Sequence, residues 1–241
     1  MRNINSLIVS PHPDDAALSL STTIDSLAKK TLITTFDFSK EEIGGVVDTG
    51  IRQNEERHFA KTVDAKVIFL NEQDSNYRGE YWDKFDYTIR VSDLDRITSK
   101  YLKILESFNM PFNLFVPMAF GLHPDHVMSF YCCLCLFSKI ASTEIDIYFY
   151  HDLPYFLGAD AKMASQKTII NTTNLIQIQT VHKEKEKLLK LYKSQLSDKY
   201  LKAFLEKSTT EYLRSCSGSQ LLTLDLCKID SLARMDGISL I

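Results

Sequence analysis

Short apolar runs alternate along the chain with longer segments in which apolar residues recur at helical spacing. Such runs are typical of strands that are buried on both faces of a sheet. They predict strands at 6–10, 31–38, 66–70, 113–117 and 145–150. The longer segments predict helices at 16–30, 52–63, 93–108, 123–140 and 181–205. The first of these helices closes on two lysines, which favour a helix C-terminus because positive charge is stabilising there.

The order of these elements indicates the fold class. Strands that alternate with helices favour a parallel sheet, because parallel neighbours need crossover connections. We expect a Rossmann-like three-layer α/β/α sandwich with a mostly parallel sheet, formed as a single domain over residues 1–241. The segments 74–85 and 152–173 show few periodic runs, so we expect loops or capping segments there. In such sheets, ligands bind beyond the carboxyl ends of the strands.

The charge balance argues against nucleic acid as a partner. The formal net charge is -3, and the two signs are interspersed, so the chain has no basic stripe of the kind that binds a phosphate backbone. The apolar run before Pro11 is too short for a signal peptide or a membrane span. We therefore expect a cytoplasmic protein that does not bind a membrane, and a homo-oligomer is compatible with the sequence.

The cysteines form an odd set without CxxC spacing, at positions 132, 133, 135, 216 and 227. The first three crowd one apolar stretch, where buried cysteine usually behaves as a small hydrophobic residue. We predict reduced, buried thiols here in preference to a metal cluster.

One polar segment follows the first predicted strand and contains His12, Asp14 and Asp15 between and after two prolines. The prolines restrict the backbone, and the second one biases His12 toward an extended conformation. His12 and Asp15 could turn toward one metal ion, while Asp14 stays available as a general base. Imidazole nitrogen and carboxylate oxygen are ordinary zinc ligands, and a catalytic zinc keeps three protein ligands and an open position for water.

A second polar segment, His123-Pro124-Asp125-His126, follows the strand predicted at 113–117. Proline suits the first helical position, and the two histidines lie three residues apart on one side of a helical start. One of them would complete a site of two histidines and one carboxylate. The other could polarise or protonate the substrate, and Asp125 could orient that ring and favour its charged form.

Each segment alone also reads as an ordinary helix entry, because Pro-Asp-Asp is a common capping sequence. Two such segments that each follow an apolar strand, and that together supply three ligands with an acid and a base, favour a catalytic site. The remaining histidines, His58, His151 and His182, lack this context, and we interpret them as surface or structural residues.

The two segments resemble those of the LmbE-like (PIG-L) zinc de-N-acetylases, which combine an early His-x-Asp-Asp segment with a later His-Pro-Asp-His segment on a Rossmann-like fold. The similarity is closest to a branch with Ser-Pro-His-x-Asp-Asp-Ala, matched here by residues 10–16. Weaker similarities extend it over most of residues 6–195. They are Glu55 with 63–65, the stretch 74–78, the stretch 152–155, and 192–195.

The resemblance implies a role for each matching residue. It implies that His12, Asp15 and His126 bind zinc and that Asp14 is the general base. His123 would act as the acid or as the oxyanion stabiliser, with Asp125 as its partner. The family also uses an arginine near the cleft, for which the candidates are Arg52 and Arg78, although either could instead form a surface ion pair.

The chain departs from the family pattern at the first helix. Many members have Glu after the two aspartates and a glycine-rich helix start, whereas this chain has Ala16 and then Ser19, Ser21, Thr22 and Thr23. Such changes could alter the pocket while leaving the ligands intact.

Together these features predict a zinc-dependent hydrolase that removes an N-acyl group, expected to be acetyl, from a small-molecule sugar or glycoconjugate. Iron or manganese could replace zinc at such ligands. One alternative is an amidase that cleaves a peptide-like or thiol-conjugate amide, because activated water attacks any well-placed amide carbonyl. Another is a non-catalytic sugar-binding protein, although such a protein has no need for Asp14 and His123. Nucleotide binding through a glycine-rich motif is excluded, since no such motif occurs.

Overall fold

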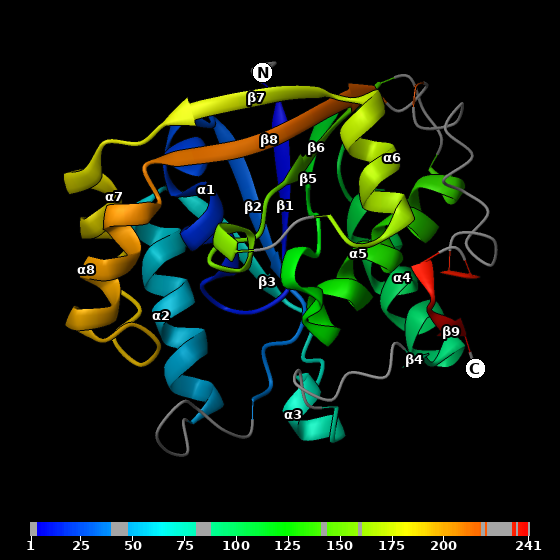
Figure 1. Cartoon of the computed structure of the whole chain (residues 1–241), viewed down its shortest axis with the longest axis horizontal. Helices are drawn as coiled ribbons and strands as arrows, with labels where there is room; N and C mark the ends of the chain where they lie inside the picture. Colours follow the sequence, from blue (N-terminus) through cyan, green and yellow to red (C-terminus); the bar gives the residue numbers. More distant parts are fainter. Residues whose placement is uncertain are drawn as a thin grey trace.

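The computed structural model describes residues 4–39, 48–80, 88–140, 144–158, 161–217, 220, 233–234 and 236–240. A seven-stranded sheet forms its centre, in the order β3-β2-β1-β5-β6-β8-β7 (Figure 1). The strands are β1 (Asn5–Ser10), β2 (Lys29–Thr34), β3 (Ala65–Phe69), β5 (Phe112–Pro117), β6 (Ile145–Tyr150), β7 (Asn174–Gln179) and β8 (Thr210–Ser217). β4 (Thr88–Ile89) and β9 (Ser239–Leu240) form a separate two-stranded sheet.

The five strands from β3 to β6 are parallel, as the sequence predicts, and the predicted α/β fold class is confirmed. The chain runs from β1 outward to β2 and β3, and then returns to the other side of β1 with β5 and β6. The strand order therefore reverses between β1 and β5. A reversal of this kind opens a crevice at the carboxyl ends of the two strands, where α/β proteins bind ligands.

The predicted single domain includes ranges outside the described residues and stays a prediction.

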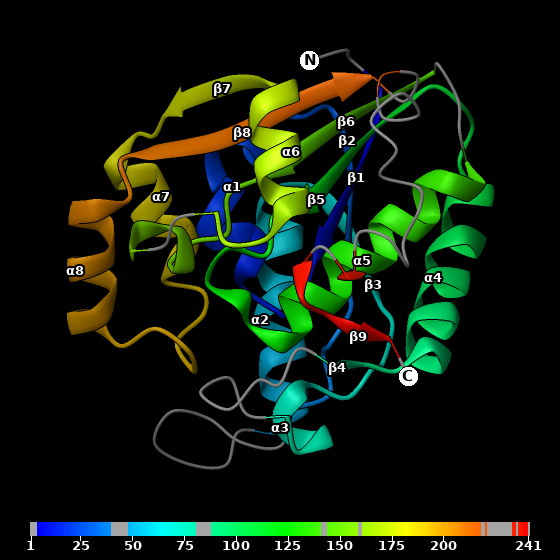
Figure 2. The same ribbon diagram turned by 45° about the vertical axis from the view of Figure 1, so that its right-hand side comes forward.

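Helices cover both faces of the sheet (Figures 1 and 2). One face packs against α1 (Asp15–Ser26), α2 (Thr49–Thr62), α7 (His182–Leu189) and α8 (Asp198–Lys207). The other packs against α4 (Val91–Glu106), α5 (Pro124–Lys139) and α6 (Ala164–Thr172). Side chains of β1 alternate between the two cores, with Leu7 and Val9 in one and Ile8 in the other. Burial on both faces explains why this strand is a continuous apolar run.

The first helix ends earlier than predicted. It stops at Ser26, and β2 already begins at Lys29, so the two lysines belong to the strand. The amine of Lys30 nevertheless donates to the carbonyl oxygens of Ile24 and Asp25, at 2.9 and 3.0 Å. The lysine therefore satisfies the helix C-terminus as expected, but from the next element.

The predicted helix at 181–205 is wrong as a single element, because α7 and α8 are separate helices. The stretch between them contacts α2. There Ser194 donates its backbone N–H and its hydroxyl to the carboxylate of Glu55, at 2.8 and 2.5 Å. Ser197 then caps α8 by accepting a hydrogen bond from the N–H of Tyr200. These contacts with a distant segment outweigh the helical pattern.

Three elements, α6, β7 and β8, were not predicted from the sequence. β8 pairs antiparallel with both β6 and β7, so the sheet is parallel only in part. β7 alternates Ile176 and Ile178 with glutamines, which is the pattern of a half-exposed strand. Two shorter 3-10 helices, η2 (Phe120–Leu122) and η3 (Tyr155–Gly158), and the four-residue α3 (Ser75–Arg78) lie around the carboxyl ends of the strands.

Two predictions from composition have structural counterparts. Cys132, Cys133 and Cys216 are buried and Cys135 is partly buried, and none of these four forms a disulfide, whereas Cys227 lies outside the described residues. Within the part of the chain that the structure describes, no helix is both long and apolar enough to cross a membrane.

Candidate active site

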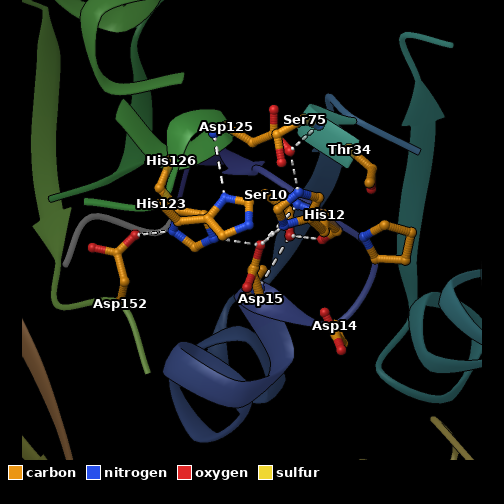
Figure 3. A network of polar contacts seen from close by, with 12 residues as sticks. Ser10, His12, Asp14, Asp15, Thr34, Ser75, His123, Asp125, His126 and Asp152 are labelled. Atoms are coloured by element: carbon orange, nitrogen blue, oxygen red, sulfur yellow. Dashed lines mark hydrogen bonds and ion pairs between the residues drawn. The ribbon is translucent and has the colours of Figure 1, made fainter. Parts of the chain in front are cut away.

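The two polar segments meet at the point where the strand order reverses (Figure 3). The first leaves β1 through a tight loop, in which the hydroxyl of Ser10 donates to the carbonyl of His12, at 2.6 Å, and accepts from the N–H of Ala16, at 3.1 Å. The second forms the N-terminus of α5, where Pro124 occupies the first turn as predicted. The loop and the helix thus bring His12 and His126 to ring centroids 5.4 Å apart.

Asp15 joins the two histidines. One oxygen of its carboxylate, Oδ2, lies 2.9 Å from Nδ1 of His12 and 3.0 Å from Nε2 of His126. The three side chains come from positions 12, 15 and 126, and all are buried. One carboxylate oxygen and two imidazole nitrogens therefore converge on a single point, as a zinc or another divalent transition metal requires.

These donor atoms fit a metal ion. Nε2 of His126 is buried and has no hydrogen-bond partner of good geometry among the described residues, although it lies beside the Asp15 carboxylate. His123 is close enough to be an alternative ligand, because nitrogen atoms of His12, His123 and His126 lie within 4.8 Å of one another. The geometry therefore gives two candidate ligand sets, which share His12 and His126.

Two further carboxylates orient the histidines that both sets share. Asp125 Oδ2 lies 2.7 Å from Nε2 of His12, and Asp152 Oδ1 lies 2.7 Å from Nδ1 of His126. Carboxylates of this kind fix the ring orientation of a ligating histidine and increase its basicity. In each pair, the ring nitrogen that faces Asp15 stays available for a metal.

The Asp125 carboxylate is hydrogen-bonded to His12 and not to its predicted partner, His123, although its charge acts to raise the pKa of the His123 ring as expected. Its carboxylate contacts His12 and also accepts from the backbone N–H of Ser75, at 2.9 Å. Only its backbone N–H reaches His123, donating to Nδ1 at 3.3 Å. Because His123 is the N-cap of α5, its ring accepts a hydrogen bond at the helix start and cannot use the same nitrogen to receive a proton.

Asp14 lies beside this cluster, and its carboxylate is separate from the contacts that Asp15 makes with the histidines (Figure 3). It is buried and has a φ of 96°, which residues other than glycine rarely adopt. Burial, followed by the nearby charge of Asp15, raises the pKa of Asp14 to about 8. The guanidinium of Arg52 lies beside it, with Nη2 at 4.0 Å from Oδ1.

Both arginine candidates lie next to the site, but protein groups already occupy them. Arg52 donates to the hydroxyl of Ser39, at 2.6 Å, and to the carbonyl of Pro13, at 3.3 Å. Arg78 forms ion pairs with Asp125, at 2.7 Å, and Glu80, at 2.6 Å. Neither pattern is a simple surface ion pair, because both side chains are largely buried. Their predicted contact with substrate stays a prediction.

The sequence profile of PIG-L, GlcNAc-PI de-N-acetylase, matches residues 7–134 and so more than half of the chain. The chain belongs to this family. Membership of this family identifies the protein as an N-deacetylase, which is a hydrolase, and confirms the resemblance found in the sequence. A search of curated proteins finds no match.

Several solved structures share the fold. A deacetylase from the teicoplanin biosynthesis pathway has a TM-score of 0.70 at 17% identity, covering 88% of this chain and 97% of its own. The A40926 pseudoaglycone deacetylase has a TM-score of 0.67 at 18% identity, covering 90% and 98%. The N,N′-diacetylchitobiose deacetylase from Pyrococcus horikoshii has a TM-score of 0.62 at 17% identity, covering 89% and 84%.

Sequence reasoning missed two residues at the site. Asp152, which orients His126, appeared only within a weak similarity at 152–155, and Glu56, which accepts from the N–H of Asp14, gave no signal. The other histidines are placed as interpreted. His58 and His182 are exposed, and His151 is buried among Phe120, Phe156 and Tyr212.

The pKa values of His12 and His126, which belong to both candidate ligand sets, predict that metal binding depends on pH. Burial alone would lower the pKa of each ring, but the carboxylates around them outweigh it. Asp15 and Asp125 raise the pKa of His12 to about 9, and Asp15 and Asp152 raise that of His126 to about 10. Both rings are therefore protonated near neutral pH without metal, and a cation must displace these protons.

We therefore expect apparent zinc affinity to rise steeply with pH, approaching about 100-fold per pH unit while two protons are released. Competition with a chromophoric chelator between about pH 6 and pH 7.5 measures this slope. The His123→Ala variant is the control, because burial and the nearby His12 lower the pKa of His123 to about 3 and it has no proton to release. An affinity that is constant over this range would contradict the prediction.

Proposed function

We propose that the protein is a zinc-dependent hydrolase that removes an N-acetyl group from a small amino sugar or glycoconjugate. One observation carries this proposal. Ring nitrogens of His12 and His126 converge on a single carboxylate oxygen of Asp15, and the carboxylate of Asp14 lies separately beside them. Three protein ligands leave an open position on a catalytic zinc for water, and the Asp14 carboxylate is available as a base beside it. A non-catalytic sugar-binding protein would not need this arrangement.

The relatives support the sugar class. The similar structures include a pseudoaglycone deacetylase and a diacetylchitobiose deacetylase, and the family profile is that of a GlcNAc-PI de-N-acetylase. These names share deacetylation, and two of them specify an acetylated amino sugar.

The side chains have separate tasks in the proposed reaction. A zinc ion held by His12, Asp15 and His126 would lower the pKa of a coordinated water to about 7 and polarise the amide carbonyl. Asp14 takes the proton from the attacking water, since it is buried near the cluster and is not needed as a ligand. His123 stabilises the developing negative charge by donating a hydrogen bond, and Asp14 returns the proton it has taken from the water to the departing amine. Asp125 and Asp152 keep His12 and His126 in their ligating orientation.

The substrate class can be tested with the zinc-loaded protein. We expect release of acetate and of free amine, in equal amounts, from N-acetylglucosamine conjugates or related N-acetyl amino sugars. Peptide-like and thiol-conjugate amides are tested in parallel, because cleavage of these alone would favour the amidase alternative. If the protein binds sugars but releases no acetate with zinc, iron or manganese, the sugar-binding alternative is favoured.

The cytoplasmic location and the oligomeric state stay predictions.

A further inference from the structure

The backbone of Asp14 is fixed by two side chains of α2. The peptide group that joins Pro13 to Asp14 presents its carbonyl to Nη2 of Arg52, at 3.3 Å, and its N–H to Oε2 of Glu56, at 3.3 Å. Arg52 and Glu56 are four residues apart and so lie on the same face of the helix. One helix face therefore contacts both polar atoms of a single peptide plane.

This peptide plane determines where the Asp14 side chain points. The angle φ of Asp14 describes rotation between that plane and the rest of the residue, and its value is 96°. Aspartate rarely adopts this angle unless surrounding contacts enforce it. The carbonyl of Asp14 is already used in the first turn of α1, where it accepts from the N–H of Leu18 at 2.8 Å. The contacts to α2 thus fix the only remaining freedom of this backbone.

Glu56 is itself held rigidly. Its side chain is 1% exposed, and it accepts from the hydroxyl of Tyr192, at 2.5 Å, and from that of Thr34, at 3.2 Å. Tyr192 is fully buried and comes from the stretch between α7 and α8, and Thr34 ends β2. A carboxylate with partners on three different elements cannot move without breaking several buried hydrogen bonds.

The neighbouring Glu55 shows what a purely structural glutamate does on this helix. It accepts from the N–H and hydroxyl of Ser194, at 2.8 and 2.5 Å, and so connects α2 to the same stretch that carries Tyr192. No described contact joins Glu55 to Asp14. The two glutamates therefore lie on the same helix and contact the same segment, but only Glu56 has a described contact with Asp14.

We propose that Glu56 is a positioning residue for the reaction: it holds the peptide plane before Asp14 and thereby directs the Asp14 carboxylate toward the attacking water. This inference rests on the proposed function for its kinetic consequence. The role depends on an acceptor oxygen at the right place and does not require a negative charge. Glutamine at position 56 can provide that oxygen, and its amide group can donate to the hydroxyl of Thr34.

The kinetic test compares alanine and glutamine at position 56. Glu56→Ala should lower kcat by roughly 10- to 100-fold, because small misplacement of a catalytic group costs this much. KM and bound zinc should stay near those of the parent protein, and Glu56→Gln should restore most of kcat. In an Asp14→Asn background, Glu56→Ala should cause little further loss, since its effect passes through Asp14. The matched control, Glu55→Ala, should lower thermal stability while leaving kcat much less affected.

Tyr192→Phe is a milder variant in case Glu56→Ala folds poorly, because it removes only one hydroxyl from the cluster. It should lower kcat by less than Glu56→Ala and should also lose its effect in the Asp14→Asn background. Equal losses from Glu56→Ala with and without Asp14 would overturn the proposal. A similar loss of kcat in Glu55→Ala would do the same.

A crystal structure of Glu56→Ala provides a readout that is independent of activity. We expect the peptide before Asp14 to rotate and the Asp14 carboxylate to change direction, whereas Glu55→Ala should leave both in place. An Asp14 that keeps its φ and side-chain direction in Glu56→Ala would overturn the positioning role, whatever the activity. Lack of any deacetylase activity in the parent protein would count against the proposed function alone, and the crystallographic result would still decide the role of Glu56.

Discussion

Replacing His12, Asp15 or His126 with alanine is expected to leave the protein without stoichiometric zinc and with only background turnover. Each side chain is buried, and Asp15 Oδ2 lies within 3.0 Å of ring nitrogens of both histidines, so each truncation removes one of the three protein donors that converge there. Loss of a residue that merely orients a ligand weakens metal binding by roughly 10- to 100-fold. Loss of a ligand itself should therefore exceed the upper end of that range.

The measurement is metal content after dialysis against a weak chelator, with turnover measured on the same samples. His123→Ala is the matched control, because it removes an imidazole from the same cluster. It should retain zinc and lose roughly 10²- to 10³-fold in kcat, the scale of losing one oxyanion-stabilising donor. If His123→Ala loses its metal while Asp15→Ala retains it, the set of three histidines is the correct one.

Asp14→Asn is expected to retain zinc and to lower kcat by roughly 10²-fold or more, as loss of a general base does. Asparagine preserves the shape of the side chain and can still occupy the same backbone conformation. It cannot accept a proton from water near neutral pH, so the loss should appear in kcat and leave KM little changed. Kinetics with the zinc-loaded variant and metal analysis together test this expectation.

Asp37→Asn is a suitable control for this variant. Asp37 is also a fully buried aspartate, and it accepts from the side chain of Gln53, at 2.6 Å, and from the backbone of Asn71, at 2.7 Å. No described contact connects it to the metal cluster, so turnover should be largely retained. Turnover that survives in Asp14→Asn would remove Asp14 from the role of base, and it would leave the ligand assignment unaffected.

Much of the architecture could be predicted because it depends on local patterns. A buried parallel strand is a continuous apolar run, and a helix start is marked by proline and a capping residue, as at Pro124. The site segments could be located for the same reason, since each follows such a strand directly. The antiparallel β8 and the break between α7 and α8 were not predicted, because contacts with distant residues overrule the local pattern there.

The residue types at the site can be read from the chain alone, as the two histidine and aspartate segments and their order. The partner of each side chain depends on the tertiary structure. Asp125 contacts His12 across 113 positions, and Tyr192 reaches Glu56 across 136. Separations of this size leave no periodic signal, because they depend on strand order and on how helices pack across the sheet. The carboxylate that orients each ligand, and the glutamate beside the base, are therefore properties of the fold.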